Sequence, residues 1–225
     1  MGRRKQTDKD EVLIDLVETR DSAQSFFEQN QFKVLGGIAL LALIVGALFA
    51  YFLLFKTPRE AKAMSAMYKA EQQFERDSFA LALENPGGGF DGFLDIIDSY
   101  NGTKAANLAR YYAGISYLNL GLYDPAIEYL QDFSAKGALL PITKLGALGD
   151  AYSEKGEFDQ AISYYQKAVN ATANDLLTPY YLQKLGLLSD KQGNAEDAAK
   201  YFNRIKAEFP DSEEGSQIEK YIARY

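Results

Sequence analysis

The segment LGDAYSEKGEFDQAISYYQKA, residues 148–168, decides the fold, because the protein repeats its pattern on either side. The matching stretches are AGISYLNLGLYDPAIEYLQDF at 113–133 and LGLLSDKQGNAEDAAKYFNRI at 185–205. Three sets of small residues recur in them at the same offsets of 35 and 37 residues. The sets are Gly114, Gly149 and Gly186; Gly121, Gly156 and Gly193; and Ala126, Ala161 and Ala198. A period of this length predicts an all-α helical solenoid.

These segments resemble tetratricopeptide repeats, each of which is a helical hairpin. The first helix carries a small residue and, three residues later, an aromatic one, which is Tyr117 or Tyr152; Ser189 departs from this pattern. After the turn glycine, the second helix carries a small and then a large residue. The large residues are Leu130, Tyr165 and Phe202, and Pro210 matches the closing proline in the third repeat alone. We expect the small residues to let the paired helices approach, and the turn glycines to adopt the left-handed conformation that ends a helix.

Upstream of the repeats, residues 34–55 (VLGGIALLALIVGALFAYFLLF) form an uncharged run of 22 residues between Lys33 and Lys56. A helix of this length crosses a bilayer core, so we expect a transmembrane helix. A cleaved signal peptide has its apolar segment closer to the N-terminus and ends in small residues, whereas this run begins at residue 34 and ends in bulky ones. The alternative is a buried helix of a soluble protein.

Within that run, Ala42, Gly46 and Ala50 recur every four residues. This spacing places small side groups on one face, where another membrane helix would pack closely. The alternative is that glycine and alanine are simply common in membrane helices.

The signals together divide the protein into five parts. Residues 1–33 are a short tail, in which apolar residues recur at helical spacing over 11–32 with acids between them. This pattern favours an amphipathic helix that contacts protein rather than lipid, and a merely nascent helix is the alternative. The other parts are a transmembrane helix at 34–55, a juxtamembrane helix with a degenerate first repeat at 56–106, three tetratricopeptide repeats at 107–211 and a capping helix at 212–225. Within the third part, residues 58–83 have the pattern of one continuous helix.

Charge does not settle which side of the membrane each part occupies. The tail holds six basic residues, but residues 14–33 hold two and residues 56–75 hold four. The positive-inside rule weakens for long translocated domains, and the first residues are strongly basic. We therefore expect the tail inside and the repeat domain outside, and the inverse topology is the alternative.

The composition disfavours catalysis, metal binding and nucleic-acid binding. The sequence has no cysteine and no histidine, which excludes cysteine-based zinc and redox sites and removes the commonest general base. The domain at 56–225 holds 18 basic and 24 acidic residues and the tail holds six and seven, so neither part has the net positive charge expected of nucleic-acid binding. The glycine-rich stretch 86–89 lacks the lysine and the strand of a phosphate-binding loop. We expect no catalytic residue, metal or cofactor, and an enzyme stays the less favoured alternative.

By analogy with tetratricopeptide domains, first-helix side chains line an inner groove that binds extended or helical peptides. The expected groove residues are Leu108, Tyr111, Ile115, Leu118, Asp150, Ser153, Tyr180, Gln183, Leu187 and Asp190, with Thr143 and Gly146 also on this face. The alternative is that some of them face a neighbouring helix. Chaperone-binding members of the family clamp a carboxylate with Lys, Asn and Arg. Tyr111, Ile115, Gly146 and Asp150 stand at those positions here, so we expect no such clamp.

A single anchor near the N-terminus, a short tail and a repeat domain together resemble the YfgM-like family of bacterial inner-membrane proteins. The resemblance implies an accessory subunit of the SecYEG translocon in the inner membrane, with a cytoplasmic N-terminus and a periplasmic domain. The implied partners are a membrane-anchored periplasmic chaperone of the prolyl-isomerase type, emerging unfolded secretory chains, or both. The alternative is a scaffold in another cell-envelope assembly or a motility complex.

Overall fold

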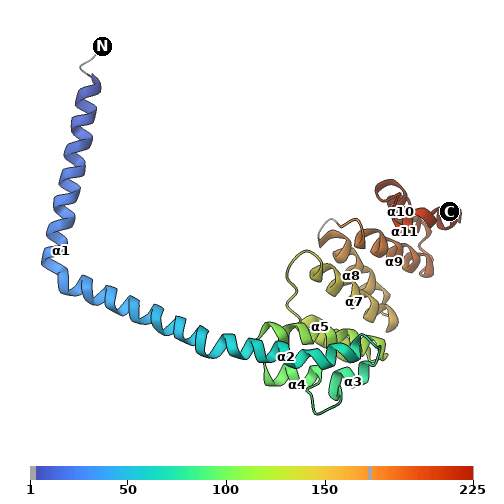
Figure 1. The fold of residues 1–225 in the computed structure, drawn as a ribbon. Coiled ribbons are helices and arrows are strands. Elements are labelled where there is room, and N and C mark those ends of the chain that lie inside the picture. Colours follow the sequence, from blue (N-terminus) through green and yellow to red (C-terminus); the bar gives the residue numbers. More distant parts are fainter. Residues whose placement is uncertain (1–3, 172–173, 225) are drawn as a thin grey trace. The chain divides into compact units, whose positions relative to one another are not determined.

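A computed structural model describes residues 4–171 and 174–224, with backbone alone for residues 4–25 and 27. The described residues are helical and contain no strand, which confirms the all-α fold class. The protein divides into two compact units, Met1–Pro58 and Arg59–Tyr225 (Figure 1).

The first unit consists of α1 (Arg4–Tyr51) and a short π-helical segment, η1 (Phe52–Lys56). Helical geometry is interrupted at Asn30 (φ −120°, ψ 17°), whose side-chain amide donates a hydrogen bond of 3.1 Å to the Phe26 carbonyl. This bond accompanies the break, since a side chain on the carbonyl four residues back competes with the helix for its acceptor. The backbone of the tail is therefore helical. Its amphipathic face was predicted from side chains that, except for Phe26, lie outside the described residues.

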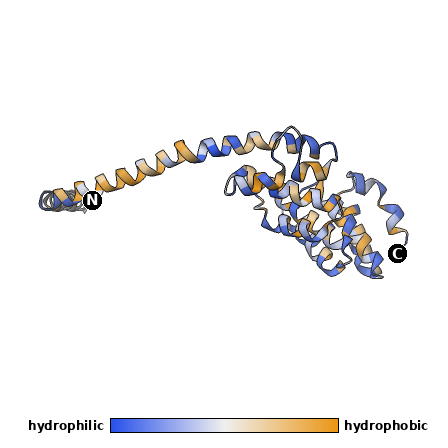
Figure 2. Cartoon of the chain, turned by 90° about the horizontal axis from the view of Figure 1, so that it is seen from below, coloured by the Kyte–Doolittle hydropathy of each residue, from blue (hydrophilic) through white to orange (hydrophobic). Residues whose placement is uncertain are grey.

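One helix in the described part of the protein, Glu28–Phe74, is apolar and long enough to cross a membrane, with a mean hydropathy of 2.8 in its most apolar window. No residue of that window is buried, which disfavours the alternative of a soluble core helix. Figure 2 shows the run as a mostly hydrophobic stretch of helix. Ala42, Gly46 and Ala50 are exposed, and no atom lies within 4 Å of a Cβ built on Gly46. The helix is compatible with a membrane anchor.

The second unit begins with α2 (Thr57–Phe74), α3 (Phe79–Glu84) and α4 (Phe93–Ser99). The single helix expected over 58–83 is wrong: the backbone turns at 75–78, where Asp77 has a left-handed φ of 57°. The turn lets Met67 of α2 and Leu83 of α3 share one buried cluster with Phe93 of α4. Burial of this shared apolar surface stabilises two short helices better than one long exposed helix.

Three helical hairpins follow, as the repeat period predicts. They are α5 (Lys104–Asn119) with α6 (Tyr123–Asp132), α7 (Leu140–Glu154) with α8 (Phe158–Ala171), and α9 (Leu177–Lys191) with α10 (Ala195–Glu208). Their turn glycines have φ values of 74°, 79° and 78°, the conformation expected of Gly121, Gly156 and Gly193. A residue with a Cβ is strained there, so glycine ends each first helix.

Inside each hairpin, the small residue of the first helix faces the large residue of the second. A Cβ added to Gly114 would lie 2.6 Å from Leu130 Cγ. At Gly149 it would lie 2.5 Å from Tyr165 Cδ1, and at Gly186 it would lie 2.4 Å from Phe202 Cε1. The second-helix alanines, Ala126, Ala161 and Ala198, are fully buried. The prediction that small residues let the paired helices approach and that large residues fill the space between them is therefore confirmed.

The C-terminal segment forms α11 (Glu213–Gln217) and α12 (Glu219–Ile222) rather than the single helix expected after residue 212. Between them the hydrogen bonds span three residues instead of four, from Ile218 N to Gly215 O and from Tyr221 N to Ile218 O. Ile218 is buried in the cluster of the second and third hairpins. The tighter turn thus lets the segment cover the end of the apolar core, as a solenoid end requires.

Candidate functional site: the groove of the first helices

The groove residues expected from the sequence lie on α5, α7 and α9, and none of the ten is buried. Tyr180 and Leu187 are the most exposed of the large apolar ones, at 39% and 40%. Tyr111, Ile115 and Leu118 also pack against the cluster that joins the first two hairpins. Those three residues therefore face a neighbouring helix in part, which was the alternative interpretation.

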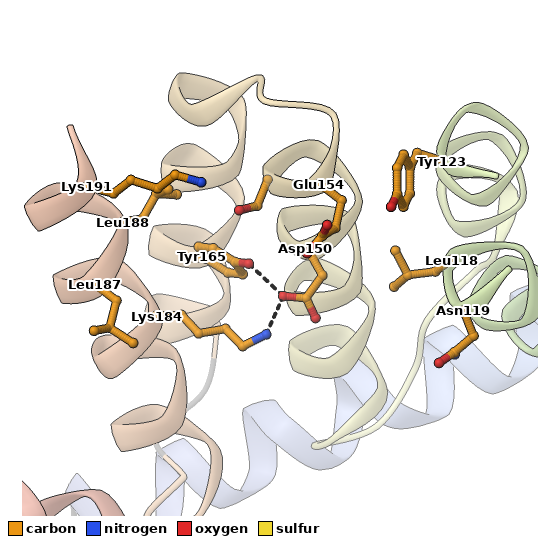
Figure 3. A pocket seen from close by; sticks show the side chains of 11 residues that line it. Leu118, Asn119, Tyr123, Asp150, Glu154, Tyr165, Lys184, Leu187, Leu188 and Lys191 are labelled. Carbon is orange, nitrogen blue, oxygen red and sulfur yellow. Dashed lines mark hydrogen bonds and ion pairs between the residues drawn. The ribbon is translucent and has the colours of Figure 1, made fainter. Parts of the chain in front are cut away.

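A cavity of about 560 Å³ crosses all three hairpins (Figure 3). The first hairpin supplies Leu118, Asn119 and Tyr123 to its wall. The remaining lining residues come from the second and third hairpins: Asp150, Ser153, Glu154, Tyr165, Lys184, Leu187, Leu188 and Lys191. The sequence-based set thus contributes Leu118, Asp150, Ser153 and Leu187.

The other expected groove residues lie outside this cavity. Leu108 lines a second cavity of about 450 Å³, together with Phe133 and Leu140. Asp190 pairs with Arg224 at 3.5 Å near the C-terminus. The remaining four, Tyr111, Ile115, Gln183 and the exposed Tyr180, line neither cavity.

Asp150 lies at the centre of the cavity wall. Its Oδ1 accepts a hydrogen bond of 2.6 Å from the Tyr165 hydroxyl and an ion-paired hydrogen bond of 2.5 Å from Lys184 Nζ. Lys184 also lies over the rings of Tyr180 and Tyr165, at 4.9 Å and 5.7 Å from their centroids. The carboxylate and the ammonium group are therefore held in place from two hairpins.

Two glycines of α7 make this arrangement possible. Because Gly149 has no side chain, the Tyr165 ring packs directly on α7. The Tyr165 hydroxyl then reaches Asp150, the residue that follows Gly149. Gly146 does the same for Tyr181, since a Cβ there would lie 2.0 Å from the tyrosine hydroxyl. Gly146 was expected in the groove and is instead buried beneath that ring. The positions of the site residues therefore depend on how closely the helices of the hairpins pack.

Burial and charge set the ionisation of these groups. Burial, followed by the charge of Asp150 and its hydrogen bond, raises the pKa of Tyr165 far above that of a free tyrosine. Burial and the same carboxylate also raise the pKa of Tyr181. For Lys184, burial alone would lower the pKa, but the adjacent Asp150 carboxylate outweighs it and the pKa is raised. At neutral pH the site therefore holds an ion pair between neutral tyrosines.

Sequence reasoning missed Lys184 and the groove role of Tyr165. Tyr165 was interpreted as the large packing residue of its hairpin, and it is that as well. Lys184 follows Asp150 by 34 residues, about one repeat, on the next first helix. Opposite charges one repeat apart were the signal in the sequence that could have indicated this ion pair.

Among the described residues, no group of three or more Asp or Glu residues is placed to hold a metal ion. Two exposed acids have different contacts. Asp124 pairs with Lys155 at 2.7 Å, and Glu154 lines the cavity. The arrangement offers apolar side chains, hydrogen-bond donors and acceptors. These are the means of binding a polypeptide.

Comparison with known families identifies the repeats. Family models of the tetratricopeptide repeat match residues 108–136, 145–180 and 180–212, which follow the three hairpins. The C-terminal part of the protein is therefore a tetratricopeptide-repeat region. A search of curated proteins returned no significant match.

Proposed function

We propose that the protein is a membrane-anchored, non-enzymatic scaffold whose groove binds a polypeptide partner. The observation that carries this proposal is the cavity shared by α5, α7 and α9, with exposed apolar side chains beside a fixed ion pair. Concave faces of helical repeats commonly serve as binding surfaces. The exposed apolar helix before the repeats would hold the scaffold in a bilayer.

The specific setting follows from the YfgM-like resemblance. The scaffold would be an accessory subunit of the SecYEG translocon in the bacterial inner membrane, with its tail in the cytoplasm and its repeats in the periplasm. The groove would bind a membrane-anchored chaperone of the prolyl-isomerase type, emerging secretory chains, or both. Ala42, Gly46 and Ala50 would face a membrane helix of the same complex.

Site-specific crosslinking in living cells tests the partners. A photo-crosslinking residue at Tyr180 in the groove should capture the chaperone or secretory chains, and one at Gly46 should capture translocon subunits. Capture of components of another envelope assembly at both positions would replace the translocon assignment. Absence of any protein adduct at Tyr180 would contradict the scaffold proposal itself.

Protease treatment of intact spheroplasts tests the topology. The repeat domain from residue 59 onward should be degraded while the tail survives. A protected repeat domain would favour the inverse topology, with the groove facing the cytosol.

A further inference from the structure

The ion pair in the groove has hydrogen-bonding capacity that the fold does not use. A carboxylate has two oxygens, each with two lone pairs, and a lysine ammonium has three N–H donors, of which Lys184 uses one for Asp150 and one for the Tyr180 hydroxyl. Both internal bonds of Asp150 go to Oδ1, which accepts from Tyr165 and from Lys184. Among the described residues, none donates a hydrogen bond to Oδ2, and Figure 3 shows this second oxygen without a dashed line.

Both partners of the pair also remain accessible. The side chain of Asp150 is 29% exposed and that of Lys184 is 27% exposed, and both line the cavity. A ligand in the cavity therefore meets an acceptor and a donor side by side. The pair is rigid, because the Tyr165 hydroxyl holds the carboxylate and two aromatic rings flank the ammonium group.

The surrounding cavity does not select for a charged ligand. Glu154 and Lys191 add one charge of each sign to the wall, so the lining carries no net charge. Leu118 lies on one side of Asp150, and Leu187 lies on the other side (Figure 3). A neutral group with one donor and one acceptor, flanked by apolar side chains, complements this wall. The peptide unit of a polypeptide backbone is such a group.

We propose that the Asp150–Lys184 pair binds the backbone of an extended, apolar polypeptide segment. A backbone amide of the ligand donates to Asp150 Oδ2, a backbone carbonyl of the ligand accepts from Lys184 Nζ, and apolar side chains contact Leu118 and Leu187. The proposal rests on the proposed function and adds the chemistry of the partner. Backbone recognition accepts many sequences, so it suits unfolded segments better than one charged terminal motif.

Peptides that lack a single backbone N–H test this mode of binding. The probe is a fluorescein-labelled nine-residue peptide of alternating leucine and serine, and each further peptide carries one N-methylated residue. N-methylation removes the donor and keeps the side chain. Fluorescence anisotropy with the full-length protein in detergent micelles should show binding that one central methylation weakens about tenfold or more, the range for a hydrogen bond to a charged group.

Variants of the protein then assign the lost contact. Asp150→Ala should weaken binding of the unmethylated peptide by a similar factor and abolish the difference between the peptides. Lys184→Met should weaken binding and keep the sensitivity to methylation. Glu128→Gln, at an exposed position of α6 outside the cavity, is the matched control and should leave both affinities unchanged. The methylation series with the unaltered protein remains decisive if Asp150→Ala does not fold.

Three results would overturn the proposal: equal affinity for all peptides, equal methylation sensitivity in Asp150→Ala, or binding only after acidic or basic residues are added. Failure of the proposed function has a different signature, the absence of protein adducts at Tyr180 in cells. Adducts at Tyr180 together with equal peptide affinities would leave the scaffold standing and remove backbone recognition by Asp150.

Discussion

Replacing Gly149 with alanine should unfold the second repeat more easily, through one identifiable clash. The added Cβ would lie 2.5 Å from both Cδ1 and Cε1 of Tyr165, a residue that is only 3% exposed and whose hydroxyl is held by Asp150. Overpacking of a core costs about 1–3 kcal/mol, and a clash with a rigid ring belongs at the upper end. Alanine gains about 1 kcal/mol over glycine in a helix interior. The net loss of unfolding free energy should be about 2 kcal/mol, the difference between these two effects.

Urea unfolding of the full-length protein in mild detergent measures this loss. Far-ultraviolet circular dichroism follows the helices, and tyrosine emission follows the repeats, because the sequence has no tryptophan. Gly46→Ala is the control, since Gly46 lies in the first unit with no atom within 4 Å of its added Cβ, and it should change the unfolding free energy of the repeats by less than about 0.5 kcal/mol.

A double-mutant cycle with Tyr165→Ala separates the clash from other effects. Without the ring, Gly149→Ala should cost nothing and should even gain its helix propensity, so the coupling energy should be about 2–3 kcal/mol. Equal destabilisation by Gly149→Ala in both backgrounds would refute the assignment to Tyr165. Wild-type stability of the single variant would refute the packing argument altogether.

Three further predictions concern a turn, a cap and the pH. Gly156→Ala, at φ 79°, should destabilise the second hairpin by about 1 kcal/mol in the same urea assay, whereas Gly156→Asn should cost less; equal losses would contradict the left-handed requirement. Glu60→Ala should cost about 1 kcal/mol, because its carboxylate accepts from the Lys104 and Ala105 amides at 2.9 Å and 3.1 Å at the start of α5, and a stability equal to wild type would show that this cap is replaced by water. Burial raises the folded-state pKa of Tyr165, so its stability contribution is complete below the unfolded tyrosine value of about 10 and is lost as pH rises above it. Ultraviolet difference spectra should therefore show hydroxyls that ionise only on unfolding, and that step should be smaller by one tyrosine in Tyr165→Phe, because Tyr181 remains.

The repeat period predicts the hairpins well because each repeat is built from local rules. A turn glycine at positive φ and a small residue opposite a large one are properties of single positions, so Gly149 and Tyr165 are recognisable in the sequence. The same reasoning fails upstream. Nothing in the helical pattern of 58–83 marks Asp77 as a turn, because the turn depends on where Met67 and Leu83 find a shared apolar partner.

The groove is only partly predictable for a similar reason. First-helix positions identify a face, and each of the ten residues expected to line it has some exposure. Which of them share a cavity depends on how three hairpins stack, so Leu118, Asp150 and Leu187 converge while the rings of Tyr111 and Phe133 pack with their centroids 5.2 Å apart. The pairing of Asp150 with Lys184 depends on rotamers across a repeat boundary, which periodicity does not specify.

Polypeptide binding by the face of the first helices is tested most directly by crosslinking from two faces of the same domain. A photo-crosslinking residue at Ser153 lines the cavity, and one at Glu128 is exposed on the second helix α6 and serves as the control. In cells, we predict discrete protein adducts from Ser153 that Glu128 does not give. Equal adducts from both positions, or adducts from Glu128 alone, would contradict binding by this face.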